Sequence, residues 1–154
     1  MLLRSHSRRM ILTGPEETEA LGRRLARELM AGDVVALFGD LGAGKTTLAR
    51  GVLAGLGHDG EVASPTFPIV IPYETLALPV WHVDLYRIEH PSEIEELALD
   101  EAIEDGAVIV EWPERMGRAL WPHSLRLTLR REGEGARALT AAVPAAWEAR
   151  WPPR

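Results

Sequence analysis

The sequence contains no cysteine, asparagine or glutamine, and it has a single lysine among its 154 residues. The absence of cysteine excludes disulfide bonds, a thiol nucleophile and a cysteine-ligated zinc site. Without asparagine and glutamine, no side-chain amide can orient a water molecule for attack. No apolar run approaches the length of a membrane span, and the basic segment 1–10 lacks the apolar stretch of a signal peptide. We therefore expect a cytoplasmic protein with no membrane association.

Size and charge limit the remaining possibilities. The chain is 46% hydrophobic and 26% charged, and its length suits one well-buried core, so we predict a single domain over residues 1–154. Its formal net charge is −6. Proteins that hold nucleic acid unaided usually present a strongly basic face, so we do not expect tight binding to RNA by this chain alone.

The most informative stretch is residues 39–47, GDLGAGKTT, which fits the phosphate-loop pattern G-x-x-x-x-G-K-[ST]. Glycines allow the backbone to curl so that several N–H groups face one polyphosphate, and the helix that follows adds its positive end. Lys45 would place its ammonium on the outer phosphates, and Thr46 would offer a hydroxyl to Mg²⁺. The pattern therefore predicts a nucleotide site.

Lys45 is also the only lysine, beside sixteen arginines. A planar guanidinium cannot replace a compact ammonium in a phosphate loop, which explains why lysine stands at this one position.

The surrounding pattern predicts the elements that such a loop requires. An apolar strand over 33–38 precedes it and a helix over 45–56 follows it. An amphipathic helix with leucines 21, 25 and 29 should end at Gly32. Further strands are expected at 9–13, 69–73, 79–85 and 107–110, helical segments at 91–97 and 99–105, and a hairpin with arms 125–130 and 137–143, in which we find no chemistry. We expect Trp147 and Trp151 to be packing anchors.

These elements predict an α/β fold: a single P-loop NTPase-like domain whose mostly parallel central sheet is flanked by helices and followed by a C-terminal β-hairpin. Asp84 and Glu111 each close an apolar strand-like run, where α/β sheets place catalytic groups. Glu111 is the best candidate for a second magnesium ligand. His82 lies two residues before Asp84 on the same face, and a hydrogen-bonded structural role is favoured for it over a chemical one.

Four segments together resemble the bacterial TsaE family: GDLGAGKTT at 39–47, SPTF at 64–67, HVDLYR at 82–87 and EWPE at 111–114. Their order and spacing match over roughly residues 13–114. The resemblance implies a small ATPase that works with TsaB and TsaD in the threonylcarbamoyl modification of adenosine in tRNA, and that meets tRNA only indirectly through that complex.

The resemblance also implies roles for particular residues. ATP and Mg²⁺ are the expected cofactors. The nucleotide would be held by residues of the loop and by two residues outside it: Leu41, Gly42, Ala43, Gly44, Lys45, Thr46, Thr47, Thr66 and Trp112. Trp112 would flank either the nucleotide or the partner interface. Thr46 and Glu111 would hold the metal. Lys45, Asp84 and Glu111 would form the catalytic set, with Asp84 ordering either a metal-bound water or the attacking water.

Two other functions use the same motifs. A kinase would share the loop and the metal but would need an acceptor pocket beside Asp84 acting as base. An ATP-gated binding module would use the nucleotide to order the segment 64–68, with hydrolysis serving only to reset it. The products of ATP consumption, and the dependence of partner binding on ATP, distinguish these from an ATP hydrolase.

Overall fold

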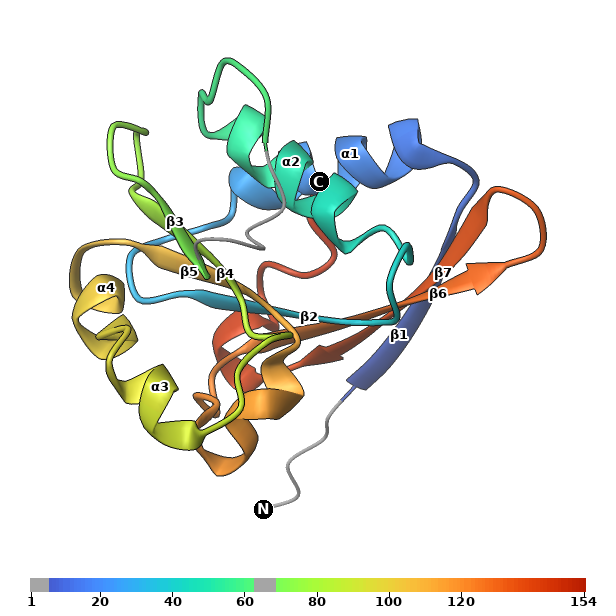
Figure 1. Cartoon of the computed structure of the whole chain (residues 1–154). Coiled ribbons are helices and arrows are strands. Elements are labelled where there is room, and N and C mark those ends of the chain that lie inside the picture. The colour runs from blue at the N-terminus through green and yellow to red at the C-terminus, as the bar shows by residue number, and fades with distance from the viewer. Residues whose placement is uncertain (1–5, 63–68) are drawn as a thin grey trace.

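Seven strands form one sheet in the order β1-β7-β6-β2-β5-β4-β3 (Figure 1). The structure is a computed structural model that describes residues 6–62 and 69–154. The strands are β1 (His6–Leu12), β2 (Val34–Phe38), β3 (Val70–Tyr73), β4 (Val80–Asp84), β5 (Ala107–Glu111), β6 (Leu125–Glu132) and β7 (Ala136–Val143).

The centre of the sheet is parallel. β2 pairs in parallel with both β5 and β6, and β4 pairs in parallel with β5. The outer pairs β1–β7, β6–β7 and β3–β4 are antiparallel. This arrangement confirms the predicted fold class, including the hairpin formed by β6 and β7. Because the four central strands run the same way, their carboxyl ends meet at one edge of the sheet.

Helices cover both faces of the sheet (Figure 1). The helical segments are α1 (Pro15–Ala26), α2 (Lys45–Gly55), α3 (Pro91–Glu95), α4 (Leu99–Asp105) and the 3₁₀ segments η1 (Pro113–Ala119) and η2 (Ala145–Trp147). Leucines of α1 and α2 pack in one core with Val35, Leu37 and Ile109. Residues of α3, α4 and η1 pack in a second core with the alternate residues Val34, Ala36 and Val108. No helix in the described ranges has the length and apolar character to cross a membrane.

The predicted end of the first helix was wrong. Helix α1 ends at Ala26, and the chain continues through tight turns in which Glu28 N–H bonds the carbonyl of Leu25. Asp33 Oδ2 accepts a hydrogen bond from Met30 N–H at 2.7 Å, which draws the chain away from the helical path. Leu29 is nevertheless buried, so the periodicity correctly marked a core residue outside the helix.

The segment after β7 returns to the first core. Trp147 and Trp151 are buried there, as predicted for packing anchors. Arg150 stacks over the Trp147 ring at 3.8 Å and donates to both carboxylate oxygens of Asp33, at 2.6 and 3.0 Å. Asp33 immediately precedes β2, so the C-terminal segment is tied to the start of the strand that leads to the phosphate loop.

Candidate active site

The phosphate loop lies at the carboxyl edge of the sheet, between the end of β2 at Phe38 and the start of α2 at Lys45. Gly42 and Gly44 have φ angles of 75° and 107°. Side chains with a Cβ rarely adopt these angles, so glycine at both positions is what allows the loop to curl. The predicted strand, loop and helix therefore occur in the expected order and position.

Lys45 points into the site rather than into solvent. Its side chain is buried, and its Nζ has no hydrogen-bond partner among the residues that the structure describes. The Nζ atom lies 4.0 Å from the centroid of the Trp112 ring. Burial lowers the pKa of Lys45, while the charges of Glu111 and Asp84 act in the opposite direction. The ammonium therefore has hydrogen-bond donors that no described residue uses.

Asp84 and Glu111 stand opposite each other in the register of β4 and β5, so both carboxylates share one face and one edge of the sheet. Asp84 Oδ1 accepts a hydrogen bond from Tyr86 N–H at 2.9 Å. Burial raises the pKa of Asp84, and the nearby Glu111 carboxylate raises it further, against the lowering effects of the Tyr86 N–H and Lys45. The structure thus brings together the three residues predicted as the catalytic set.

His82 completes this cluster from within the core. Its Nε2 lies 2.6 Å from Glu111 Oε2, and both side chains are buried. The hydrogen bond fixes one oxygen of Glu111, Oε2. The hydrogen bond expected for His82 is present, but it joins His82 directly to a candidate site residue, which the sequence did not indicate.

Trp112 adopts a left-handed backbone conformation, with φ of 57°, at the junction between β5 and η1. This conformation is uncommon outside glycine and is frequent at functional sites. The indole ring lies over Lys45 and also contacts the Tyr86 ring at 4.9 Å between centroids. The predicted nucleotide contact Thr66 falls in the segment 63–68, outside the described residues.

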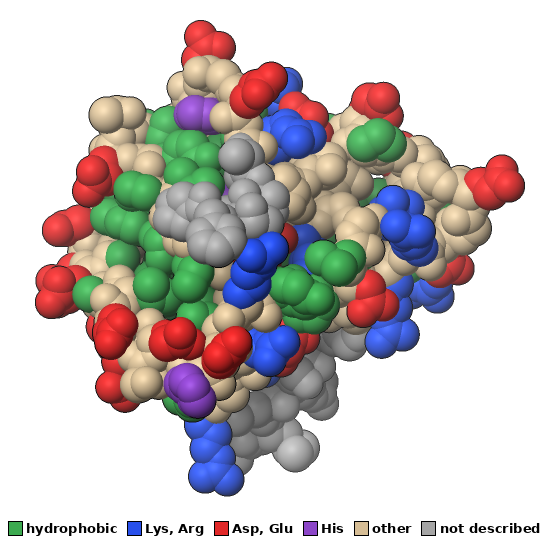
Figure 2. Space-filling view, in the orientation of Figure 1, with side chains coloured by type: hydrophobic (Ala, Val, Ile, Leu, Met, Phe, Trp, Pro, Cys, Tyr) green, Lys and Arg blue, Asp and Glu red, His purple; other side chains and the backbone are tan. Residues whose placement is uncertain are grey.

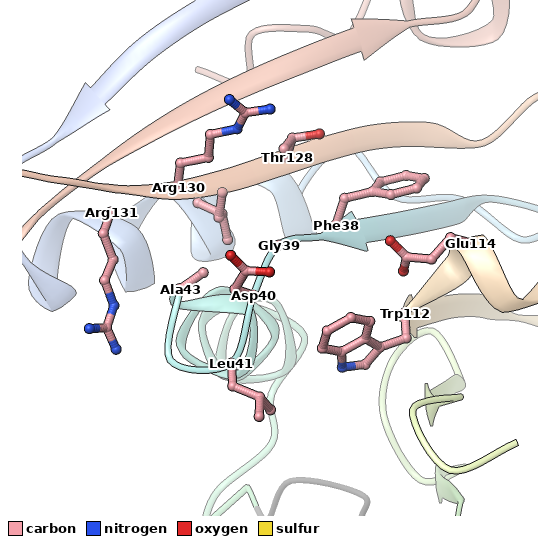
Figure 3. Close-up of a pocket in the computed structure, with 11 residues that line it drawn as sticks. Phe38, Gly39, Asp40, Leu41, Ala43, Trp112, Glu114, Thr128, Arg130 and Arg131 are labelled. Carbon is pink, nitrogen blue, oxygen red and sulfur yellow. The ribbon is translucent and has the colours of Figure 1, made fainter.

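Two cavities adjoin the loop. One of about 500 Å³ is lined by Lys45, Thr46 and Thr47 together with Asp84 and Glu111. The other, of about 830 Å³, lies beside it and shares Leu41 and Trp112 (Figure 3). Asp40 and Glu114 line the second cavity with Arg130 and Arg131. The smaller cavity is lined by residues that the sequence predicts to bind phosphate and metal, and it is the candidate active site.

Charge is distributed unevenly over the face that Figure 2 shows. Acidic side chains lie along the side that carries α3 and α4, whereas basic side chains gather near the base of the β6–β7 hairpin. The basic side lies next to the loop and suits an anionic ligand.

One residue at the loop was missed from the sequence. Arg137, on β7, donates from Nε to the carbonyl of Ala43 at 3.0 Å and from Nη2 to the carbonyl of Gly42 at 3.2 Å. We expected no site residue in the hairpin. Nothing local in the sequence marks Arg137, because its contact depends on how far β6 extends beyond β2.

This is a P-loop NTPase-like α/β protein, because it has a parallel central sheet, a phosphate loop after β2, and an acidic residue at the end of both β4 and β5. Residues 12–139 match the family model described as threonylcarbamoyl adenosine biosynthesis protein TsaE. This chain belongs to the TsaE family.

Individual relatives agree with the family model. The chain is 42% identical over 127 residues to the tRNA threonylcarbamoyladenosine biosynthesis protein TsaE of Bacillus subtilis, covering 82% of this chain and 79% of that one. It is 48% identical over 114 residues to the Streptomyces coelicolor protein of the same name, covering 72% and 77%. The crystal structure of Bacillus subtilis YdiB superposes with a TM-score of 0.80 at 34% identity, covering 94% of this chain and 90% of that chain.

Proposed function

We propose that this protein is a Mg²⁺-dependent ATP hydrolase that acts in the threonylcarbamoyladenosine modification of tRNA, in complex with TsaB and TsaD. Membership of the TsaE family supports the pathway. The site geometry supports the chemistry. The protein would bind ATP, hydrolyse it and associate with its partners, and it would not need to bind tRNA directly.

The observation that carries the proposal is the buried Lys45 Nζ at the end of the phosphate loop, which has no hydrogen-bond partner among the residues that the structure describes. Burying a charged group whose hydrogen bonds are not made is unfavourable, so proteins seldom keep one that no ligand uses. A polyphosphate held by the loop N–H groups would supply acceptors to the ammonium. The positive φ angles of Gly42 and Gly44 give the loop the curl that such a ligand requires.

The residues present also fit Mg²⁺. Within residues 6–62 and 69–154, no three His, Asp or Glu side chains form a ready-made metal cluster. Magnesium in phosphate-transfer sites commonly needs only one or two protein ligands, since phosphate oxygens and water complete its shell. Thr46 and Oε1 of Glu111 would serve as those ligands. The metal would supply neutralisation of charge on the transferring phosphoryl group.

Asp84 is the group best suited to handle the water. Its raised pKa and its position beside Glu111 allow its carboxylate to accept a hydrogen bond from a water molecule near the terminal phosphate. The Tyr86 N–H occupies Oδ1 and leaves Oδ2 for that contact. Lys45 would stabilise the negative charge of the phosphate oxygens, and Trp112 would shield the site from solvent.

A direct assay is release of inorganic phosphate from ATP by the purified chain, alone and with TsaB and TsaD. We expect slow release alone and faster release in the complex. Equal rates with and without the partners would contradict stimulation. ATP consumption without free phosphate, with label passing to an acceptor, would instead identify a kinase.

Two substitutions test the assigned residues. Lys45→Ala and Glu111→Ala should each abolish phosphate release while leaving the circular dichroism spectrum unchanged. Arg126→Ala is a matched control, since Arg126 is an exposed cation on β6 away from the loop. Normal hydrolysis by Glu111→Ala would remove Glu111 from the metal site.

A further inference from the structure

Arg137 holds the phosphate loop from outside the motif. Besides its bonds to the carbonyls of Ala43 and Gly42, it donates from Nη1 to its own neighbour, Ala136, at 2.9 Å. Its side chain also lies close along the loop, because a Cβ placed on Gly44 would stand 3.8 Å from Arg137 Nε. One guanidinium thus joins two consecutive loop peptides to the β6–β7 hairpin.

These bonds fix the direction of the N–H groups. In a trans peptide, the C=O and the N–H of the following residue point in opposite directions. Because Arg137 holds the Ala43 carbonyl, the N–H of Gly44 points away from the guanidinium. The Gly42 carbonyl is held in the same way, and the N–H of Ala43 on its far side donates to the Asp40 carbonyl at 3.1 Å. Arg137 therefore orients the peptide between Ala43 and Gly44, and it shares the orientation of the peptide between Gly42 and Ala43 with the Asp40 carbonyl.

The hairpin carries a second guanidinium at the same place. Arg131 is the direct cross-strand partner of Arg137, and its Nη2 would stand 2.5 Å from a Cβ on Gly42. Like charges directly opposite each other on a sheet are destabilising. Their placement against the phosphate loop is consistent with an anion that both would favour.

We propose that Arg137 is a positioning residue that preorganises the phosphate loop for a polyphosphate. The inference rests on the proposed nucleotide binding and adds to it a residue outside the motif. Without Arg137, the peptide between Ala43 and Gly44 must be ordered by the ligand itself, which costs affinity. The loss applies to the phosphates that the loop contacts and not to the rest of the nucleotide.

The test compares ADP with AMP, both with Mg²⁺, by isothermal titration calorimetry on the full chain. Replacing Arg137 with alanine should weaken ADP binding about tenfold, since two hydrogen bonds to the loop are lost, and should change AMP binding by less than about twofold. Arg137→Lys should lie between, because an ammonium cannot reproduce the two-pronged geometry. Arg126 is an exposed cation on the neighbouring strand, so Arg126→Ala should bind ADP and AMP as the unmodified protein does.

The ADP-to-AMP affinity ratio separates positioning from general stability. A purely structural role for Arg137 would lower the melting temperature but leave this ratio unchanged, and that result overturns the inference. If Arg137→Ala does not fold, an unchanged ratio in Arg137→Lys overturns it equally. Failure of the unmodified chain to bind ADP at all would instead refute the proposed function, so the two ideas fail in distinguishable ways.

Discussion

Replacing Lys45 with methionine should make the ligand-free protein more stable while abolishing nucleotide binding. The Lys45 ammonium is buried without a hydrogen-bond partner in the described part of the chain, which by analogy with other buried polar groups costs about 1–3 kcal/mol. Its contact with the Trp112 ring at 4.0 Å returns about 0.5–2 kcal/mol. Methionine has similar length and flexibility and fills the same space. The charges of Glu111 and Asp84 favour the ammonium but are outweighed by its burial, so the net gain should be at most about 1 kcal/mol, or at most about 2–4 °C in melting temperature.

The assay is urea unfolding of both proteins without nucleotide, followed by titration with ADP. Arg126→Met is the matched control, since it removes one positive charge from an exposed position. A loss of stability above about 1 kcal/mol in Lys45→Met would show that the ammonium is well satisfied in the ligand-free state. The main support for the proposed function would then disappear.

The difference in stability between Lys45→Met and the unmodified protein should change with pH in a definite direction. Burial lowers the pKa of Lys45 in the folded protein, so the unfolded chain binds the proton more tightly. Between the two pKa values the stability of the unmodified protein rises with pH. The advantage of Lys45→Met should therefore be largest at neutral pH and should shrink as the pH approaches about 10.4, the ordinary value for lysine.

Three further predictions follow from neighbouring contacts. Because burial raises the pKa of Asp84, Asp84→Asn should stabilise the ligand-free protein at pH 7 in urea unfolding. This gain in stability should vanish as the pH falls toward about 4. A gain that persists at low pH would contradict the raised pKa. Gly42→Ala should cost about 1–2 kcal/mol at a φ of 75° and also weaken ADP binding, since Arg131 must move; unchanged ADP affinity would show that the loop tolerates the shift. Arg150→Ala should cost about 3–5 kcal/mol in urea unfolding by leaving the Asp33 carboxylate buried and unpaired, and a loss below about 1 kcal/mol would mean that water replaces the guanidinium.

The sequence predicted the parts of the site that depend on local pattern. The loop at 39–47 is a contiguous motif, and Asp84 and Glu111 follow apolar runs whose strand character is visible in isolation. Parallel strands then bring both acids to one edge. The fold class followed from the order of these elements, because alternating strands and helices strongly restrict the possible topologies.

The features of the fold and site that the sequence did not predict depend on strand register and on contacts between residues far apart in the chain. The bond between His82 and Glu111 requires β4 and β5 to be neighbours with Asp84 opposite Glu111, and no local pattern sets that register. The contact of Arg137 with the loop depends on a pairing between segments ninety-four residues apart. The end of α1 was displaced by the carboxylate of Asp33, a tertiary contact that outweighs helical periodicity.

The sheet order has a consequence for how the chain folds as it is made. Among the described residues, β1 pairs with β7 alone, and β2 has β6 as one of its two neighbours. The residues that carry every recognised motif are therefore synthesised before two of the strands that complete their sheet. Until the β6–β7 hairpin emerges, β1 has no strand to pair with and one side of β2 is an open edge. Folding of the part of the chain that carries these motifs should thus wait for the last strands, and a chaperone or ribosome contact during that interval would protect the open side of β2, which is paired in the finished protein.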